Sequence, residues 1–170
     1  MNIQTKRLTI APLQLDMATA LHLLSLDEDN RRFVPDEVFE TVEVAEETLR
    51  YLMHCYEAEG GPLVYALLLD EAMIGYVQAV PMEDDAWEIG YHIGKDYTCC
   101  GFATEAVQAF LPVIMDKLHL QEIQGICLRD NIASCKVMYR CGFIKVFDGL
   151  GLYQGQEREI CRFVYRKENR

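Results

Sequence analysis

Three apolar segments with strand-forming residues follow one another at close spacing in the middle of the chain. They cover residues 63–69 (LVYALLL), 73–80 (MIGYVQAV) and 86–93 (AWEIGYHI), and only the connectors DEA and PMEDD separate them. A parallel connection needs a crossover of about a dozen residues or more, so connectors this short make neighbouring strands antiparallel. The sequence therefore predicts an antiparallel meander at the centre of the fold.

The chain before this meander shows the pattern of one strand and two helices. Residues 5–13, TKRLTIAPL, alternate apolar and polar side chains as a half-buried strand does. A helix is predicted from Asp16, as its N-cap, to about Leu26, and a second from Thr41 to the glycine-proline breaker at residues 60–62. The polar segment between the two helices contains Pro35 and is predicted to be a loop with room for a helical turn.

After the meander, helices and strands alternate. Apolar residues at helical spacing predict a helix over 102–118, which Pro112 should kink. A strand over 122–128, a helix from Asn131 to Cys141, and strands over 143–147 and 158–165 follow, the last two joined by a loop over 148–157. These elements predict a single α+β domain over residues 1–170. Its central sheet should be mixed, mostly antiparallel, of about six to seven strands, with helices on both faces.

Composition and charge exclude several classes of protein. With 51% hydrophobic and 25% charged residues, the chain has the composition of a globular protein. Its formal net charge of −11 argues against nucleic acid as a partner and favours cationic substrates. The sequence has no run of 18 apolar residues and no signal-peptide pattern, which predicts a cytoplasmic protein without membrane contact. Seven scattered cysteines without a CxxC pair predict neither a disulfide framework nor a metal site.

The segment GKDYTCCGFATEA, residues 94–106, leads from the meander into the next predicted helix. Its glycine and small side chains leave backbone N–H groups at the helix N-terminus accessible to an anion such as a phosphate. The alternative is a tight turn that only starts a helix. No Lys-Ser/Thr pair follows the glycine and no three-glycine pattern is present, which disfavours Walker-type and dinucleotide sites. The remaining functional interpretation is an anion site at Gly101, Ala103 and Thr104.

A second motif, RDNIASCKVMYRCGF at residues 129–143, follows one strand later. In this order the two motifs resemble those of GNAT-superfamily N-acetyltransferases, which carry a Q/R-x-x-G-x-G/A loop and later an N-x-x-S/A helix closed by G-F. The loop here is TCCGFA, residues 98–103, and the helix begins with NIAS, residues 131–134, and closes with Gly142 and Phe143. TKRLTIAPL and EIGYHIGKDY also resemble segments of the branch that acetylates the N-termini of ribosomal proteins.

The resemblance implies a binding site for acetyl-CoA as cosubstrate and no metal. The pyrophosphate would lie on backbone amides of the loop. The pantetheine arm would pair with the backbone where the strand 86–93 splays from the strand 122–128, and a strand amide there would polarise the thioester carbonyl. The implied cofactor-binding residues are Tyr91, His92, Ile93, Thr98, Cys99, Cys100, Gly101, Phe102, Ala103, Thr104 and Asn131. Thr98 and Cys100 replace polar residues usual in the family, which predicts fewer side-chain contacts and weaker cofactor binding.

Acetyl transfer to an amine requires a base for the amine and an acid for the leaving thiolate. Many relatives use a tyrosine seven residues after the motif asparagine as the acid. That position is Met138 here, and Tyr139 lies about 100° further round the helix. Ser134 is the candidate acid, with Tyr139 or water as alternatives, but it is equally interpreted as a plain polar residue in a capped helical turn. Glu88 is the candidate base, or else a charge at the rim of its strand.

The predicted function is an acetyl-CoA-dependent N-acetyltransferase that moves the acetyl group to a primary amine by direct attack in a ternary complex. The acceptor, a peptide N-terminus or a small-molecule amine, should lie between the first two helices and residues 148–157. The missing tyrosine and the modest base favour amines of low pKa. The alternatives are a non-catalytic acyl-CoA-binding sensor or interaction module, and redox control through Cys99 and Cys100. The sequence leaves the oligomeric state open, a homodimer included.

Overall fold

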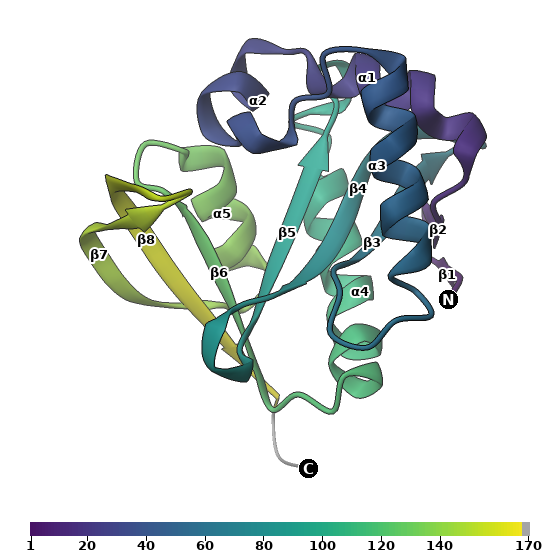
Figure 1. Ribbon diagram of the computed structural model, residues 1–170. Helices are drawn as coiled ribbons and strands as arrows, with labels where there is room; N and C mark the ends of the chain where they lie inside the picture. The colour runs from purple at the N-terminus through teal and green to yellow at the C-terminus, as the bar shows by residue number, and fades with distance from the viewer. Residues whose placement is uncertain (168–170) are drawn as a thin grey trace.

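The computed structural model describes residues 1–167 and contains an eight-stranded sheet with helices on both faces (Figure 1). The strand order is β1-β2-β3-β4-β5-β6-β8-β7. Neighbouring strands are antiparallel except β5 and β6, which are parallel. The strands are β1 (Ile3–Gln4), β2 (Thr9–Pro12), β3 (Leu63–Leu69), β4 (Ala72–Pro81), β5 (Trp87–Ile93), β6 (Glu122–Leu128), β7 (Ile144–Tyr153) and β8 (Gln156–Arg166). The α+β class, the mixed sheet and the β3-β4-β5 meander are confirmed.

The sheet has more strands than the predicted six to seven because the N-terminal segment forms two short strands instead of one. A turn separates β1 from β2, in which the Thr5 N–H donates to the Leu8 carbonyl at 2.9 Å and the Leu8 N–H donates to the Thr5 hydroxyl at 2.8 Å. The chain therefore folds back on itself before β2 pairs with β3.

The helices are α1 (Ala18–Ser25), α2 (Glu28–Phe33), α3 (Val42–His54), α4 (Phe102–Lys117) and α5 (Ile132–Arg140). Short 3₁₀ turns lie between the longer elements, namely η1 (Leu15–Met17), η2 (Pro35–Glu37), η3 (Glu83–Asp85) and η4 (Lys95–Tyr97). Pro112 lies inside α4. None of the helices in residues 1–167 is long and apolar enough to cross a membrane.

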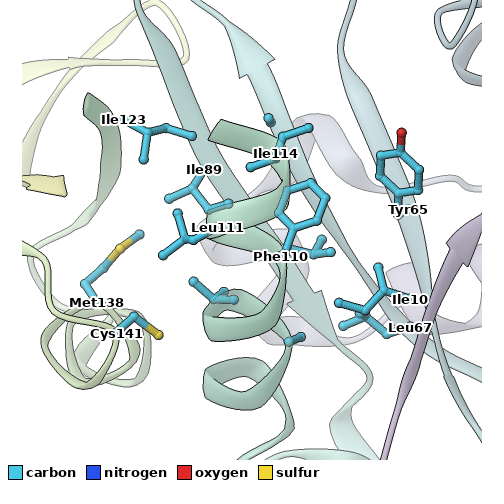
Figure 2. Packing of buried hydrophobic residues seen from close by; sticks show 14 of the residues in the cluster. Ile10, Tyr65, Leu67, Ile89, Phe110, Leu111, Ile114, Ile123, Met138 and Cys141 are labelled. Atoms are coloured by element: carbon cyan, nitrogen blue, oxygen red, sulfur yellow. The ribbon is translucent and has the colours of Figure 1, made fainter. Parts of the chain in front are cut away.

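The two faces of the sheet carry separate apolar cores. Alternate side chains of a strand point to opposite faces, and β3 follows this rule. Tyr65 and Leu67 pack with Phe110 of α4, as Figure 2 shows, whereas Val64 and Ala66 belong to the cluster that α1 and α3 cover. Helices on both faces are thus confirmed, and the strands between them are buried on both sides.

The helix boundaries follow local capping signals in most places. The Thr41 hydroxyl accepts from the Val44 N–H at 3.3 Å, so Thr41 caps α3 as predicted. The prediction that Asp16 caps the first helix is wrong, because Asp16 lies within η1 and α1 starts without a side-chain cap. Between the two helices, where a loop was expected, Asp27 caps α2 by accepting from the Asn30 N–H at 2.9 Å.

The predicted loop over residues 148–157 is instead the tip of a long hairpin. β7 and β8 pair from Ile144 and Val164 to Tyr153 and Gln156. The turn consists of Gln154 and Gly155, both with positive φ (50° and 73°), which is the two-residue geometry that suits twisted hairpin strands. The hairpin brings residues 152–154 towards α2 and η2, where the Tyr153 hydroxyl donates to the Phe33 carbonyl at 2.9 Å.

Candidate active site

A cavity opens where the two parallel strands diverge. Within the described residues, β5 and β6 are joined by a single bridge, between Glu88 and Gln124, and Figure 1 shows them spreading apart beyond it. The cavity has a volume of about 890 Å³ and is lined by β4, β5, β6, one side of α5, the loop before α4, α2, η2 and the tip of the β7–β8 hairpin. The splay that the family resemblance implied is therefore present.

The loop before α4 presents free amide donors to this cavity. Gly101 has φ +82° and occupies the N-cap position of the 16-residue helix, and no side chain caps that helix. The first intrahelical hydrogen bond runs from the Glu105 N–H to the Gly101 carbonyl at 3.1 Å. The N–H groups of residues 102–104 consequently have no partner within the helix, and the helix dipole adds partial positive charge there. This geometry fits an anion such as a pyrophosphate.

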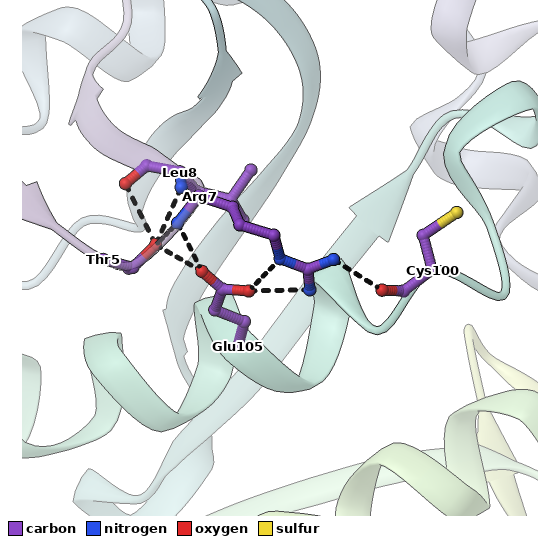
Figure 3. A network of polar contacts seen from close by, with 5 residues as sticks. All are labelled: Thr5, Arg7, Leu8, Cys100 and Glu105. Carbon is purple, nitrogen blue, oxygen red and sulfur yellow. Dashed lines mark hydrogen bonds and ion pairs between the residues drawn. The ribbon is translucent and has the colours of Figure 1, made fainter.

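The N-terminal segment holds this loop in place (Figure 3). Arg7 donates from Nη1 to the Cys100 carbonyl at 3.0 Å and from Nε to Glu105 at 2.7 Å, and its guanidinium lies 4.3 Å from the centre of the Phe102 ring. The Thr5 hydroxyl also donates to Glu105, at 2.7 Å. Burial alone would raise the pKa of Glu105, but these hydrogen bonds lower it below its ordinary value. Sequence analysis gave no role to Arg7 or Glu105, although Arg7 lies within the TKRL motif.

The structure brings almost all of the predicted site residues to the same cavity. The residues that line it are Glu88, Tyr91, His92, Ile93, Thr98, Cys99, Gly101, Phe102, Ala103, Thr104, Asn131 and Ser134. Cys100 is not among the lining residues, and its backbone carbonyl accepts a hydrogen bond from Arg7. The Thr98 hydroxyl donates to the Lys95 carbonyl at 2.8 Å. Tyr139, the alternative acid, is 54% exposed and packs edge-on against Phe163, outside the residues that line the cavity.

Ser134 is joined to β5 by a tyrosine. The Tyr91 hydroxyl lies 2.9 Å from the Ser134 hydroxyl and 3.1 Å from the Ser134 carbonyl, and burial raises the pKa of Tyr91, which stays protonated. The Asn131 side chain accepts from the Ser134 N–H at 3.1 Å, which confirms Asn131 as the N-cap of α5. Met138, in the usual position of the acid, is buried against Gly125. A hydroxyl is thus fixed at the cavity by both its helix and β5.

Two carboxyl groups, one from β5 and one from η2, also line the cavity. Burial raises the pKa of Glu88 to about 7, the hydrogen bond from the Ile126 backbone opposes this, and the negative charge of Glu37 adds to the rise. Glu37, at the end of η2, accepts from the Tyr76 hydroxyl and from Gln78 Nε2, the latter at 2.7 Å. Its pKa is also raised, mainly by burial. Sequence analysis did not identify Glu37, which lies in a segment predicted to be a loop.

Comparison with known proteins decides the family. A model of the acetyltransferase (GNAT) domain matches residues 7–144, which is most of the chain. The chain belongs to this family. The uncharacterized N-acetyltransferase YnaD of Bacillus subtilis (strain 168) is 27% identical over 144 residues, which cover 84% of this chain and 82% of YnaD. The resemblance noted in the sequence is thereby confirmed, and acetyl-CoA is the cosubstrate of the family.

Solved structures show the same fold over nearly the whole chain. A GNAT-family acetyltransferase from Bacillus anthracis has a TM-score of 0.82 at 22% identity, with 98% of both chains covered. RimL, a ribosomal L7/L12 α-N-protein acetyltransferase solved with coenzyme A, has a TM-score of 0.83 at 18% identity, again with 98% of both chains covered. Together with the family match, these relatives favour an N-acetyltransferase over the non-catalytic sensor.

Proposed function

We propose that the cavity between β5, β6 and α5 is the site where this N-acetyltransferase transfers an acetyl group from acetyl-CoA to a primary amine. The observation that carries the proposal is the divergence of β5 from β6 beyond a single bridge. It leaves backbone groups of β5 facing the cavity at residues 91–93, where the amides of pantetheine would pair with them. A β5 N–H in this stretch would polarise the thioester carbonyl.

The cofactor end of the cavity is proposed at the loop before α4. The free N–H groups of residues 102–104 would hold the pyrophosphate, and Lys136 and Arg140 of α5 line the same cavity. Arg7 acts on this loop indirectly, because it binds the Cys100 carbonyl rather than the proposed anion site. In this arrangement backbone amides would supply most of the contacts to the pyrophosphate.

Glu88 is the proposed general base. A carboxyl with a pKa of about 7 is ionised in a large fraction of molecules near neutral pH and holds a proton more tightly than an ordinary glutamate. It can therefore take a proton from the acceptor's ammonium group, directly or through a water, so that the neutral amine attacks the thioester. An acceptor amine of pKa near 7.8 would need less help than a lysine side chain of pKa near 10.4.

Ser134 is the proposed acid for the leaving thiolate. The single proton of the Tyr91 hydroxyl can be donated to the Ser134 carbonyl or to the Ser134 hydroxyl. In the second arrangement the serine keeps its own proton available for the sulfur of the departing coenzyme A. Tyr91 is then a positioning residue, since it fixes the serine hydroxyl without contacting the reacting atoms. The capped first turn of α5 supplies the second constraint on the serine.

The test is release of coenzyme A from acetyl-CoA in the presence of a panel of primary amines, together with calorimetric binding of acetyl-CoA. The wild-type protein should turn over at least one amine. Gly101→Val should abolish acetyl-CoA binding while circular dichroism stays native, because a side chain at φ +82° strains the loop that presents the amides. Tight binding by the wild type without turnover of any amine would contradict the catalytic proposal, and unchanged binding by folded Gly101→Val would contradict the cofactor site.

A further inference from the structure

The cavity is divided by charge. Its acidic lining residues belong to α2 with its cap, to η2 and to β5, whereas its basic lining residues belong to η4 and α5. The acidic residues are Asp27, Asp29, Asp36, Glu37 and Glu88, and the basic residues are Lys95, Lys136 and Arg140. The basic residues share elements with, or adjoin, the proposed pyrophosphate and pantetheine sites. The acidic end is therefore the part of the cavity that remains for the acceptor.

Glu37 is held at this acidic end by the sheet beneath it. Tyr76 and Gln78 of β4 donate to its two oxygens, and both lie on the sheet face that also carries Glu88 and Gly90 of β5. Gln78 pairs in register with Gly90, and a Cβ on Gly90 would lie only 2.7 Å from Gln78 Nε2. The glycine of the EIGY segment thus makes room for the amide that positions Glu37.

The two carboxyl groups interact electrostatically with each other, and neither forms an ion pair within the described part of the chain. No ion pair within residues 1–167 includes Glu37 or Glu88. His92, on the same sheet face, donates from Nε2 to the Leu24 carbonyl at 2.9 Å, and burial lowers its pKa, so it is neutral. Burial raises the pKa of Glu88, the negative charges of Glu37 and Asp36 raise it further, and the positive charge of Arg162 opposes this without forming an ion pair. A partly buried carboxylate is stabilised by a paired cation, and here the acceptor is the group available to supply it.

We propose that Glu37 is a specificity-determining residue that selects acceptors with a second cationic group, such as linear α,ω-diamines and longer polyamines. The inference rests on the proposed function. One ammonium group of the acceptor loses a proton to Glu88, and the resulting neutral amine attacks the thioester, so that a C–N bond forms and the C–S bond breaks. The departing thiolate takes a proton from Ser134, and the serine recovers a proton from the nitrogen that becomes the amide. The other amino group stays protonated and pairs with Glu37, assisted by the neighbouring Asp36.

The register of the sheet fits such a bifunctional acceptor. Glu88 pairs with Val80 on β4, two positions from the Gln78 that holds Glu37. Diagonal neighbours of this kind are about 7–8 Å apart, so Glu88 lies one diagonal step along the sheet from the amide that holds Glu37. The two carboxyl groups come from different elements, β5 and η2, and are two acidic groups lining one cavity. A single small amine could occupy one of them but not both. A chain with an amino group at each end could engage both at once.

The experiment compares acceptors that differ only in the second charge. Rates of coenzyme A release are measured with α,ω-diamines of three to six methylene groups, with the monoamine of equal length, and with the amino alcohol of equal length. At its preferred length, the wild type should show a kcat/KM roughly 10- to 100-fold higher for the diamine than for either control, the range that a charged hydrogen bond supplies. Glu37→Gln should reduce this ratio at least tenfold, whereas Glu47→Gln on the exposed side of α3 should preserve it.

A wild-type enzyme without preference for diamines, or a preference that folded Glu37→Gln retains, would overturn the inference. Because Glu37→Gln replaces one of the two acceptor oxygens with an NH2 group, one of the hydrogen bonds from Tyr76 and Gln78 is lost, and the variant's folding is checked by thermal melting. Calorimetry on the wild-type protein provides an independent measurement, in which 1,5-diaminopentane should bind at least tenfold more tightly than pentylamine. Equal binding would also overturn the inference. Failure of the proposed function is recognised separately, as absence of turnover with every amine, and leaves this binding comparison valid.

Discussion

Replacing Glu88 by glutamine should raise stability and lower activity, with the stability effect confined to neutral and alkaline pH. Burial raises the pKa of Glu88 in the folded protein from 4.5 to about 7. Between these values the unfolded chain has released the proton and the folded chain still holds it. The free energy of unfolding therefore falls as pH rises through this range and then levels off. The gap from 4.5 to about 7, at 1.36 kcal/mol per pKa unit, corresponds to about 3 kcal/mol.

Glu88→Gln keeps the size of the side chain and removes the ionisation. At pH 9 its free energy of unfolding should exceed that of the wild type by about 3 kcal/mol, with a melting temperature about 6–12 °C higher for a chain of this length. At pH 5 the two proteins should agree within about 1 kcal/mol. Urea unfolding at both pH values measures the difference, and Glu47→Gln, an exposed carboxylate on α3, is the matched control with little effect at either pH.

The same variant should lose about 10- to 1,000-fold in kcat/KM. The activity of the wild type should rise with pH near pH 7 as Glu88 ionises, and this rise should be absent in the variant. Glu88 also interacts electrostatically with Glu37, Asp36, Arg162 and Tyr153. These four residues are present in both proteins, so the comparison isolates the effect of the Glu88 carboxyl group. A variant less stable than the wild type at pH 9, or an equal change at pH 5 and pH 9, would refute the assignment of a raised pKa to Glu88.

Two further substitutions test the remaining parts of the site. Ser134→Ala should lower kcat at least tenfold with little change in the Kd for acetyl-CoA, whereas Tyr139→Phe should keep its activity because that ring lies outside the cavity. The opposite pattern would make Tyr139 the acid. Arg7→Ala should weaken acetyl-CoA binding about tenfold in calorimetry, since it frees the carbonyl that orients the amide loop. Unchanged affinity in a folded Arg7→Ala would show that the loop keeps its shape without the arginine.

Much of the fold could be predicted because its signals are local. Short connectors fix the antiparallel meander, and Thr41, Asn131 and Gly142 mark helix ends through contacts within five residues of each other. The prediction of a loop over residues 148–157 was wrong for a physical reason. Gly149 and Gly151 suggested a loop, but a Cβ at either position would press on Phe147 or Ile160, so these glycines serve packing within a strand pair.

The site was predictable where a motif carried it and not where tertiary contacts built it. The loop at residues 98–104 and the cap of α5 are contiguous patterns. Glu37 depends on Tyr76 and Gln78, which are 39 and 41 residues away, and Arg7 depends on Glu105, 98 residues away. No spacing rule connects such positions. The polar composition around Pro35 indicated a loop and concealed a carboxylate that the sheet buries.

β5 connects the parts of the site, because side chains on its two faces have different roles in the proposed reaction. Tyr91 points to α5 and positions Ser134, whereas Glu88 points to the face on which Glu37 sits. Within residues 1–167, the edge of β5 towards β6 is bridged only at Glu88, and beyond that bridge its backbone groups need partners that the sheet does not supply. In the proposed complex the cosubstrate supplies them. Base, acid and thioester would then all be positioned by one strand.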